Sequence, residues 1–294
     1  MSNTLFDLSG KIDRQTVEVL FAVKKEADTL SIPFFIVGAA ARDIILKHCY
    51  GIEPKRMTTD VDIGVSVASW EQFNQLINSL LASGKFSPTS EKQRFRFGTL
   101  LIDMVPFGAL ADEHGRISWP PEHEIFMSIV GFKGAYDSSI TVRLNSDPEL
   151  DIKVPTLPGL ALMKIISWKD RYPERKKDAE DLLLIMHKYE QAGNFDRLYD
   201  EEQELLQEED FDTRLAGIRL LGRDMAMMAD NHAARVVRNI LDAETGQQAQ
   251  YRLTTDMVRG AHIFEGNFEA INLQIKELRK GFVEVAEKRY SKYL

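Results

Sequence analysis

The sequence is poor in the features that mark secreted and membrane proteins. It holds one cysteine, Cys49, among 294 residues, so no intrachain disulfide can form, and no Cys/His cluster points to zinc. No run approaches the ~18 consecutive apolar residues of a membrane-spanning helix. Residues 1–10 lack the basic start and apolar core of a secretory signal. We therefore expect a cytoplasmic protein without a membrane partner.

An excess of positive charge is also missing. The formal net charge is −8 at pH 7, which argues against a protein that coats nucleic acid through bulk electrostatics. A local basic groove remains compatible with this balance, and the densest basic segment is 164–177. The hydrophobic fraction of 44% and the charged fraction of 28% are those of an ordinary globular protein with ample core.

The first half of the chain alternates between helical and strand patterns. Helices are predicted at 13–30, 39–47 and 70–81, the last with Ser69 as its N-cap. Strands are predicted at 34–37, 60–67, 93–97, 100–105, 125–130, 140–144 and 152–154, and Pro106 is expected to stop its strand. This pattern predicts an α+β core, a mixed sheet with flanking helices.

The second half reads as helix throughout, broken only at Gly and Pro positions. Pro155 and Pro158 mark the change in character. We therefore predict two domains, residues 1–155 as the core with the mixed sheet and residues 156–294 as an all-helical C-terminal region.

The clearest chemical pattern lies between Phe34 and Asp62. An apolar strand runs into Gly38 and then a helix, which points backbone N–H groups at an anion. Asp60 and Asp62 stand two positions apart on the next predicted strand, so their carboxylates share one face about 7 Å apart. If their oxygens close to about 4 Å, the repulsion is about 4 kcal/mol at an effective dielectric near 20. A cation between them would offset that repulsion.

Asp103 adds a third carboxylate. It is a lone charge within the apolar segment 100–105, where burial without a partner is costly. If this strand lies beside the Asp60–Val67 strand, three carboxylates converge, and such a set suits Mg²⁺ that is shared with substrate phosphates. Each acid alone has a simpler explanation as a surface residue at a strand end. The three together favour a metal site.

Charged residues also fall on apolar helix faces in the second half. Lys164 lies in the middle of the apolar arc of the helix predicted from residue 157, where it either snorkels to an edge or faces an anion such as a triphosphate. Asp178 and Asp181 share a face with apolar residues on the next helix. Ion pairs with Lys177 or Arg175 are the alternative there. Counted from Pro173 as the first helical residue, Asp178 lies beyond the first turn.

Two arginines and the histidines are less informative. Arg94 and Arg96 share one strand face opposite Phe95 and Phe97, which fits a phosphate or nucleic-acid strip and also fits a solvated strand face, the commoner case. The histidines are dispersed, and none forms a ligand pair at i, i+4, so we assign them no role.

The series Gly38-Ala39, Asp60-Val61-Asp62 and Ile102-Asp103 resembles the polymerase-β-type nucleotidyltransferase core. Leu160-x-x-x-Lys164-x-x-Ser167, followed by Lys177-Asp178-x-x-Asp181-Leu182, resembles the third and fourth motifs of the AbiEii/AbiGii toxin family. These nucleotidyltransferases belong to type IV toxin–antitoxin and phage-defence systems. The resemblance covers roughly residues 30–190.

The resemblance implies Mg²⁺- or Mn²⁺-dependent transfer of a nucleoside monophosphate from an NTP to an acceptor hydroxyl. The favoured acceptor is the 3′ end of tRNA or another RNA, and a cognate antitoxin protein would be a partner. Asp60 and Asp62 would hold the metals and the triphosphate, and Asp103 would be the metal-bound carboxylate that helps to activate the acceptor hydroxyl.

The remaining candidates surround the nucleotide in the same resemblance. Lys164 would neutralise the triphosphate, and Asp178 with Asp181 would position the nucleotide or the acceptor. The nucleotide-binding turn would contribute three residues, which are Gly38, Ala39 and Arg42.

The sequence departs from the family at two positions and leaves alternatives open. Ala39 stands where the family commonly has serine or glycine, and Leu101 stands where a lysine is expected. The segment Val37–Asp43 also resembles the start of CCA-adding enzymes and poly(A) polymerases, and aminoglycoside-type nucleotidyltransferases share the core. A degenerate fold that binds nucleotide as a partner protein without turnover is the alternative from another class.

Overall fold

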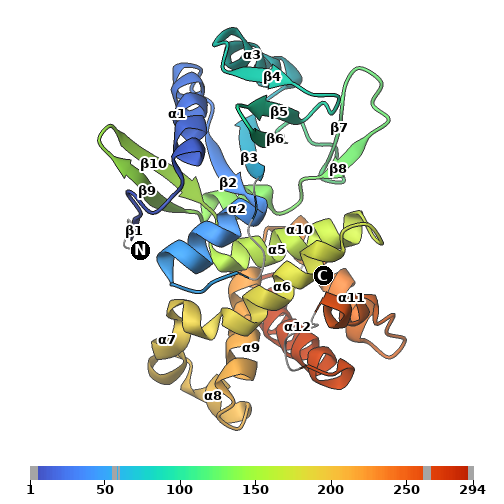
Figure 1. Cartoon of the computed structure of the whole chain (residues 1–294). Helices are drawn as coiled ribbons and strands as arrows, with labels where there is room; N and C mark the ends of the chain where they lie inside the picture. The colour runs from blue at the N-terminus through green and yellow to red at the C-terminus, as the bar shows by residue number, and fades with distance from the viewer. Residues whose placement is uncertain (1–5, 55–57, 59, 261–265, 291–294) are drawn as a thin grey trace. The chain divides into compact units, whose positions relative to one another are not determined.

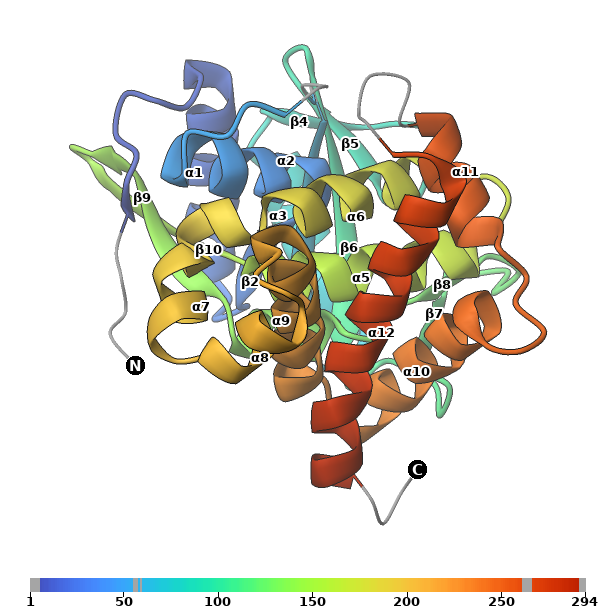
Figure 2. The same ribbon diagram turned by 90° about the horizontal axis from the view of Figure 1, so that it is seen from below.

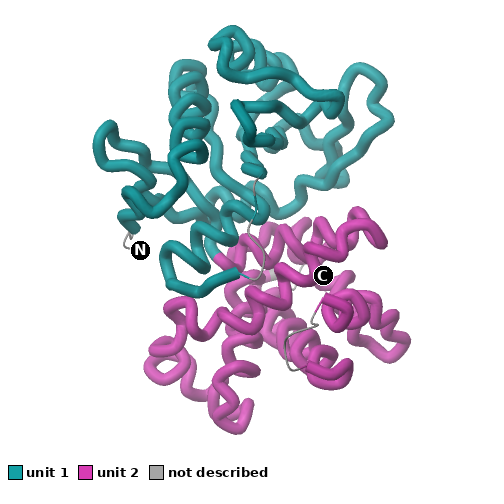
Figure 3. Tube along the Cα trace, in the orientation of Figure 1, with its two compact units in different colours: residues 1–156 teal, residues 157–294 magenta. Residues whose placement is uncertain are grey.

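The structure is a computed structural model that describes residues 6–54, 58, 60–260 and 266–290. It forms two compact units, residues 1–156 and 157–294 (Figure 3). This division lies next to the boundary expected from Pro155 and Pro158, while the assignment of separate tasks to the two units stays a prediction. Thr59, within the Asp60 segment, lies outside the described residues.

The first unit contains most of the predicted helices and strands (Figure 1). Its elements are β1 (Phe6–Asp7), α1 (Arg14–Thr29), β2 (Phe34–Val37), α2 (Gly38–Asp43), η1 (Ile44–Cys49, a π-helical segment), β3 (Asp60–Val67), α3 (Trp70–Ala82), β4 (Phe86–Pro88), β5 (Arg94–Phe97), β6 (Leu100–Gly108), β7 (Arg116–Ser118), β8 (Phe126–Ser128), α4 (Phe132–Asp137), β9 (Ile140–Ser146) and β10 (Glu149–Val154). The short elements β1, β4, β7 and α4 were not predicted, since two to six residues carry too little periodicity.

The central sheet has five strands in the order β2-β3-β6-β5-β4. β3 and β6 pair in parallel, and the other neighbours are antiparallel. The parallel pair needs a crossover, which α3 and the β4–β5 hairpin supply. Two smaller sheets, β1-β9-β10 and β7-β8, complete the described strands. The predicted α+β class with a mixed sheet is confirmed.

The two faces of the central sheet differ in character because side chains alternate along each strand. Val61, Ile63, Ile102 and Met104 are buried on one face. The opposite face carries the aromatic cluster Phe35, Phe107, Phe132 and Tyr136, whose ring centroids lie 5.5 to 6.2 Å apart. The charged residues at the start of β3 share this second face.

The prediction that Pro106 stops its strand is wrong, because β6 continues to Gly108. The pairing explains why the sheet accepts this proline. The backbone N–H of Met104 donates to the carbonyl of Gln93 on the β5 side, so the nitrogen of Pro106, two residues on, faces the same side beyond the start of β5. No ladder hydrogen bond is needed from that position.

The second unit is helical throughout its described residues. Its elements are α5 (Leu157–Asp170), α6 (Lys176–Lys188), η2 (Glu190–Asn194), α7 (Phe195–Asp200), α8 (Gln203–Glu208), α9 (Thr213–Met228), α10 (Asn231–Thr245), α11 (Arg252–Gly260) and α12 (Phe268–Tyr290). No helix in the described part of the chain is long and apolar enough to cross a membrane. Because α6 begins at Lys176 rather than at Pro173, Asp178 lies within its first turn, contrary to the prediction.

Two glycines allow α9 and α12 to approach closely (Figure 2). A Cβ added to Gly222 of α9 would lie 2.2 Å from the carbonyl oxygen of Leu278, and one added to Gly281 of α12 would lie 1.9 Å from that of Arg219. The two backbones therefore meet without side chains between them, which only glycine permits at such distances.

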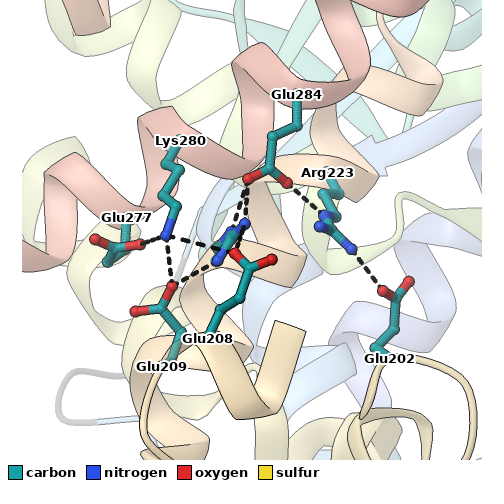
Figure 4. A network of polar contacts seen from close by, with 8 residues as sticks. Glu202, Glu208, Glu209, Arg223, Glu277, Lys280 and Glu284 are labelled. Carbon is teal, nitrogen blue, oxygen red and sulfur yellow. Dashed lines mark hydrogen bonds and ion pairs between the residues drawn. The ribbon is translucent and has the colours of Figure 1, made fainter. Parts of the chain in front are cut away.

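A charge network centred on the buried Arg219 joins the same two helices to α8 (Figure 4). Arg219 has a side chain only 4% exposed and contacts three carboxylates, with Nη1 2.7 Å from Glu209, Nη2 2.6 Å from Glu208 and Nε 2.8 Å from Glu284. Arg223 donates to the second oxygen of Glu284 at 2.7 Å. Burying a guanidinium is tolerable only when carboxylates satisfy it in this way.

We predict that Arg219→Met lowers the free energy of unfolding by about 2 kcal/mol, because Glu209 and Glu284 each lose one of two cations, although Lys280 and Arg223 stay in contact with them. Arg235 lies exposed on α10 of the same unit, and Arg235→Met is the matched control, with a change within about 0.5 kcal/mol. Urea unfolding followed by circular dichroism measures both. Equal stability of the two variants would contradict this role of Arg219.

Candidate nucleotidyl-transfer site

The candidate residues divide between the two units, and each group is described by itself. The first unit holds the glycine turn, Arg42 and the three acids Asp60, Asp62 and Asp103. The second unit holds Lys164, Asp178 and Asp181.

The acids lie on two adjacent parallel strands, as predicted from the hypothesis that β3 and β6 are neighbours. Asp62 of β3 is in register with Asp103 of β6, and Asp60 with Leu101. Neighbouring strands are about 4.8 Å apart, so Asp62 and Asp103 lie side by side on one face. All three acids are partly exposed.

β5 pairs with the other edge of β6 and places a basic residue opposite each of these two β6 residues. Arg94 is in register with Asp103, and Arg96 with Leu101. Arg94 Nε and Nη2 each lie 2.7 Å from one oxygen of Asp103, a bidentate ion pair. Hydrogen bonding to Asp103, reinforced by the charges of Asp103, Glu91 and Asp60, raises the pKa of Arg94 further above its usual range. Arg94 is therefore a functional candidate rather than part of a solvated face.

Sequence analysis missed this pair although a signal was present. β5 and β6 are joined by the two-residue turn Gly98-Thr99, with a positive φ of 58° at Gly98 that such hairpin turns require. Arg94 and Asp103 are equally distant from that turn, so a hairpin register places them opposite each other. The sequence therefore contained both parts of the signal, the lone Asp103 in an apolar strand and Arg94 at the matching position of the hairpin.

The donor chemistry of the acids fits a divalent cation. Carboxylate oxygens from two adjacent strands are the ligands that Mg²⁺ and Mn²⁺ take. Within residues 6–54, 58, 60–260 and 266–290, however, no group of three or more His, Cys, Asp or Glu is arranged to hold a metal ion. The guanidinium of Arg94 donates to both oxygens of Asp103.

The glycine turn lies directly against the acids. Gly38 has a φ of 67°, in the left-handed region, and a Cβ added there would lie 1.9 Å from Asp62 Oδ2. Residue 38 must therefore be glycine both for its backbone conformation and for the space that Asp62 occupies. α2 begins at this residue, and Ala39 follows it, half-buried.

Arg42 is buried, and its side chain donates to Asp43. Its Nη2 lies 2.6 Å from Asp43 Oδ1, and the other carboxylate oxygen of Asp43 accepts from the backbone N–H of Thr58 at 3.4 Å. The hydroxyl of Thr58 in turn accepts from the backbone N–H of Asp60 at 3.3 Å. Through these hydrogen bonds, Arg42 helps to hold in place the residue Thr58, which precedes β3.

In the second unit, Lys164 lies between two aspartates. Its Nζ is 2.8 Å from Asp178 Oδ1 and 2.6 Å from Asp181 Oδ2, and all three side chains are at most 11% exposed. Burial lowers the pKa of Lys164, but the two carboxylates outweigh it and raise the pKa above its ordinary value. Ser167 donates to the other oxygen of Asp178 at 2.9 Å. The structure brings these predicted residues together, with a weaker Arg175–Asp178 contact at 3.8 Å.

Comparison with protein families identifies the family to which the chain belongs. The family model described as nucleotidyl transferase AbiEii toxin, type IV TA system, matches residues 26–257. The chain belongs to this AbiEii family. It is therefore a nucleotidyltransferase, and the match spans both units. No curated protein matches the chain.

Solved structures that resemble this AbiEii chain are distant. A nucleotidyltransferase-like antigen from Paracoccidioides brasiliensis is 19% identical, with a TM-score of 0.39 over 68% of this chain and 93% of its own. ANT(2'')-Ia with adenylyl-2''-tobramycin is 14% identical, with a TM-score of 0.37 over 69% and 96%. The CCA-adding enzyme of Thermotoga maritima with tRNA is 13% identical, with a TM-score of 0.26 over 96% and 84%.

We predict that Gly38→Ala disrupts the site by displacing Asp62. Gly84 is the matched control, since its φ of 71° imposes the same strain but nothing lies within 4 Å of its added Cβ. Gly84→Ala should cost about 1 kcal/mol of unfolding free energy, and Gly38→Ala about 1–3 kcal/mol more from overpacking. Chemical unfolding and nucleotidyl transfer measure the effects. If both variants retain equal activity, the contact with Asp62 is unimportant.

Lys164→Met is expected to lower the free energy of unfolding by about 3–5 kcal/mol at pH 7, because two buried carboxylates lose their counter-charge. Since the pKa of Lys164 is raised, its stabilisation is fully present below the ordinary value of 10.5 and is lost as pH rises through the raised value. The difference from wild type should therefore shrink above pH 10.5.

Lys169, exposed on the same helix, provides the control for this prediction. Lys169→Met should change the unfolding free energy by less than about 0.5 kcal/mol. Urea unfolding from pH 7 to 11.5 is the measurement, and a gap between the Lys164 and Lys169 variants that grows at alkaline pH would count against the ion pairs.

Proposed function

We propose that this AbiEii-family protein transfers a nucleoside monophosphate from an NTP to an acceptor hydroxyl, with Mg²⁺ or Mn²⁺, and that the acceptor is the 3′ end of tRNA or another RNA. The observation that carries the proposal is the alignment of Asp62 with Asp103 on adjacent parallel strands, beside Asp60 and the Gly38 turn. Three carboxylates on one sheet face suit phosphoryl transfer, where positioning and charge neutralisation supply most of the catalysis.

The first unit supplies the carboxylates and the turn. In this proposal Asp60 and Asp62 hold the divalent cations together with the triphosphate, and Asp103 orients the acceptor hydroxyl. Bound divalent cations neutralise the phosphate charge and lower the pKa of the attacking hydroxyl. The backbone N–H groups after Gly38, including that of Ala39, receive phosphate oxygens, so the missing hydroxyl at Ala39 removes one contact of several.

The remaining predicted roles belong to the Lys164 group. In this proposal Lys164 neutralises charge on the triphosphate, and Asp178 and Asp181 hold Lys164 in place and position the nucleotide or the acceptor. Both carboxylates bind the ammonium at 2.6 to 2.8 Å. In this proposal the ammonium exchanges one of these carboxylates for a phosphate oxygen when the triphosphate binds.

The biological setting follows from the family and belongs to the same proposal. A type IV toxin–antitoxin role with a cognate antitoxin protein is the setting that the family description supports, and we place this role in the cytoplasm as part of the proposal. The second candidate is a nucleotide-binding protein without turnover. The bidentate hold of Arg94 on Asp103 favours this candidate, since it occupies an acid that transfer requires.

The transfer assay separates these candidates. Wild-type protein with each α-labelled NTP, Mg²⁺ and total RNA should label RNA, and Asp62→Asn should reduce labelling about a thousandfold. Asp137→Asn alters an exposed aspartate that pairs with Lys133 in an i, i+4 contact, and should retain full activity.

Two further arms use a tobramycin-type aminoglycoside and a protein extract in place of RNA. Label on the aminoglycoside alone would replace the RNA acceptor with a small molecule. Nucleotide binding without label on any acceptor would favour the non-catalytic candidate.

A further inference from the structure

Asp103 is held by a cation that belongs to the chain itself. Both of its oxygens accept from Arg94 at 2.7 Å, and the two side chains are only 16% and 27% exposed. A partly buried bidentate pair of this geometry is among the stronger ion pairs in proteins. Asp103 therefore already has its full counter-charge without a metal ion.

The guanidinium and a divalent cation compete for this carboxylate. Arg94 places one N–H group on each oxygen, so a metal ion would have to share both oxygens with the guanidinium. Two positive centres about 4 Å apart also repel each other by about 4 kcal/mol per unit charge product at an effective dielectric near 20. Asp103 thus binds either Arg94 closely or the divalent cation closely.

Arg94 is placed for such an exchange. It is the first residue of β5, and a second carboxylate, Glu91, lies 3.2 Å from its Nη1. When it leaves Asp103, the guanidinium can keep a partner in Glu91, so its charge is never left uncompensated. The exchange needs a side-chain rotation and no change in the sheet.

We propose that Arg94 is a positioning residue that holds Asp103 as an internal counter-cation and yields it to the divalent cation when that carboxylate joins the metal site. This inference rests on the proposed function of Asp103. Metal binding to the free protein is thereby weakened, because the third ligand must first be released from Arg94.

Arg96 provides a close control. It lies on the same face of the same strand, one ladder row away, in register with Leu101 rather than with an acid, and it is exposed. Arg94→Gln and Arg96→Gln remove the same charge from neighbouring positions. Only the first also frees Asp103.

The test is Mn²⁺ binding to the full-length protein without nucleotide, measured by calorimetry and by the electron paramagnetic resonance signal of free Mn²⁺. Arg94→Gln should bind Mn²⁺ about tenfold more tightly than wild type, whereas Arg96→Gln should change the affinity by less than about threefold. The gain should disappear in the double variant Arg94→Gln/Asp103→Asn. Arg94→Gln should also melt at a lower temperature without Mn²⁺ and gain more from adding it.

Three results would overturn the inference. They are unchanged or weaker Mn²⁺ binding by Arg94→Gln, an equal gain in Arg96→Gln, and a gain that survives Asp103→Asn. If Arg94→Gln does not fold, Arg94→Lys, which keeps the charge but loses the bidentate fork, should show a gain between wild type and tenfold, and no gain there would equally refute it. Because binding is measured without turnover, a negative transfer assay with tighter Mn²⁺ binding refutes the proposed function and leaves this inference standing.

Discussion

The parallel pairing of β3 with β6 is the constraint on which the site in the first unit depends. It places Asp62 beside Asp103 and sets the face on which Asp60 lies. Like charges directly opposite each other on neighbouring strands are destabilising, so positive charge close by stabilises this register. Arg94 supplies that charge from the neighbouring strand, and Gly38 leaves the space that Asp62 fills.

The long elements and the class of fold were predictable because their periodicity is strong. The bounds of β2 and β3 agree with the predicted strands, and Ser69 caps α3 by accepting from the backbone N–H of Gln72. Pro106 was misjudged because its effect depends on which side of the strand lacks a partner, and a single sequence does not display that. Arg94 was undervalued for the same reason, since its importance arises from register across a hairpin.

Buried cations between carboxylates occur twice in the second unit. Lys164 lies between Asp178 and Asp181, and Arg219 contacts three glutamates from two other segments. In each case, helical periodicity alone places a charge on an apolar face, which looks like an error or a binding site until its partners are known. The candidates Asp178 and Asp181 therefore stabilise their own unit, whatever further role they have towards the nucleotide.

The short turn at Gly98-Thr99 also bears on the order in which the chain folds. Arg94 and Asp103 are nine positions apart, so the β5–β6 hairpin can form on the microsecond timescale from local contacts alone. Asp62 reaches Asp103 only after a much longer loop has closed, which is slower. Loop length alone therefore favours an order in which Asp103 meets the other acids with its neutralising arginine already attached.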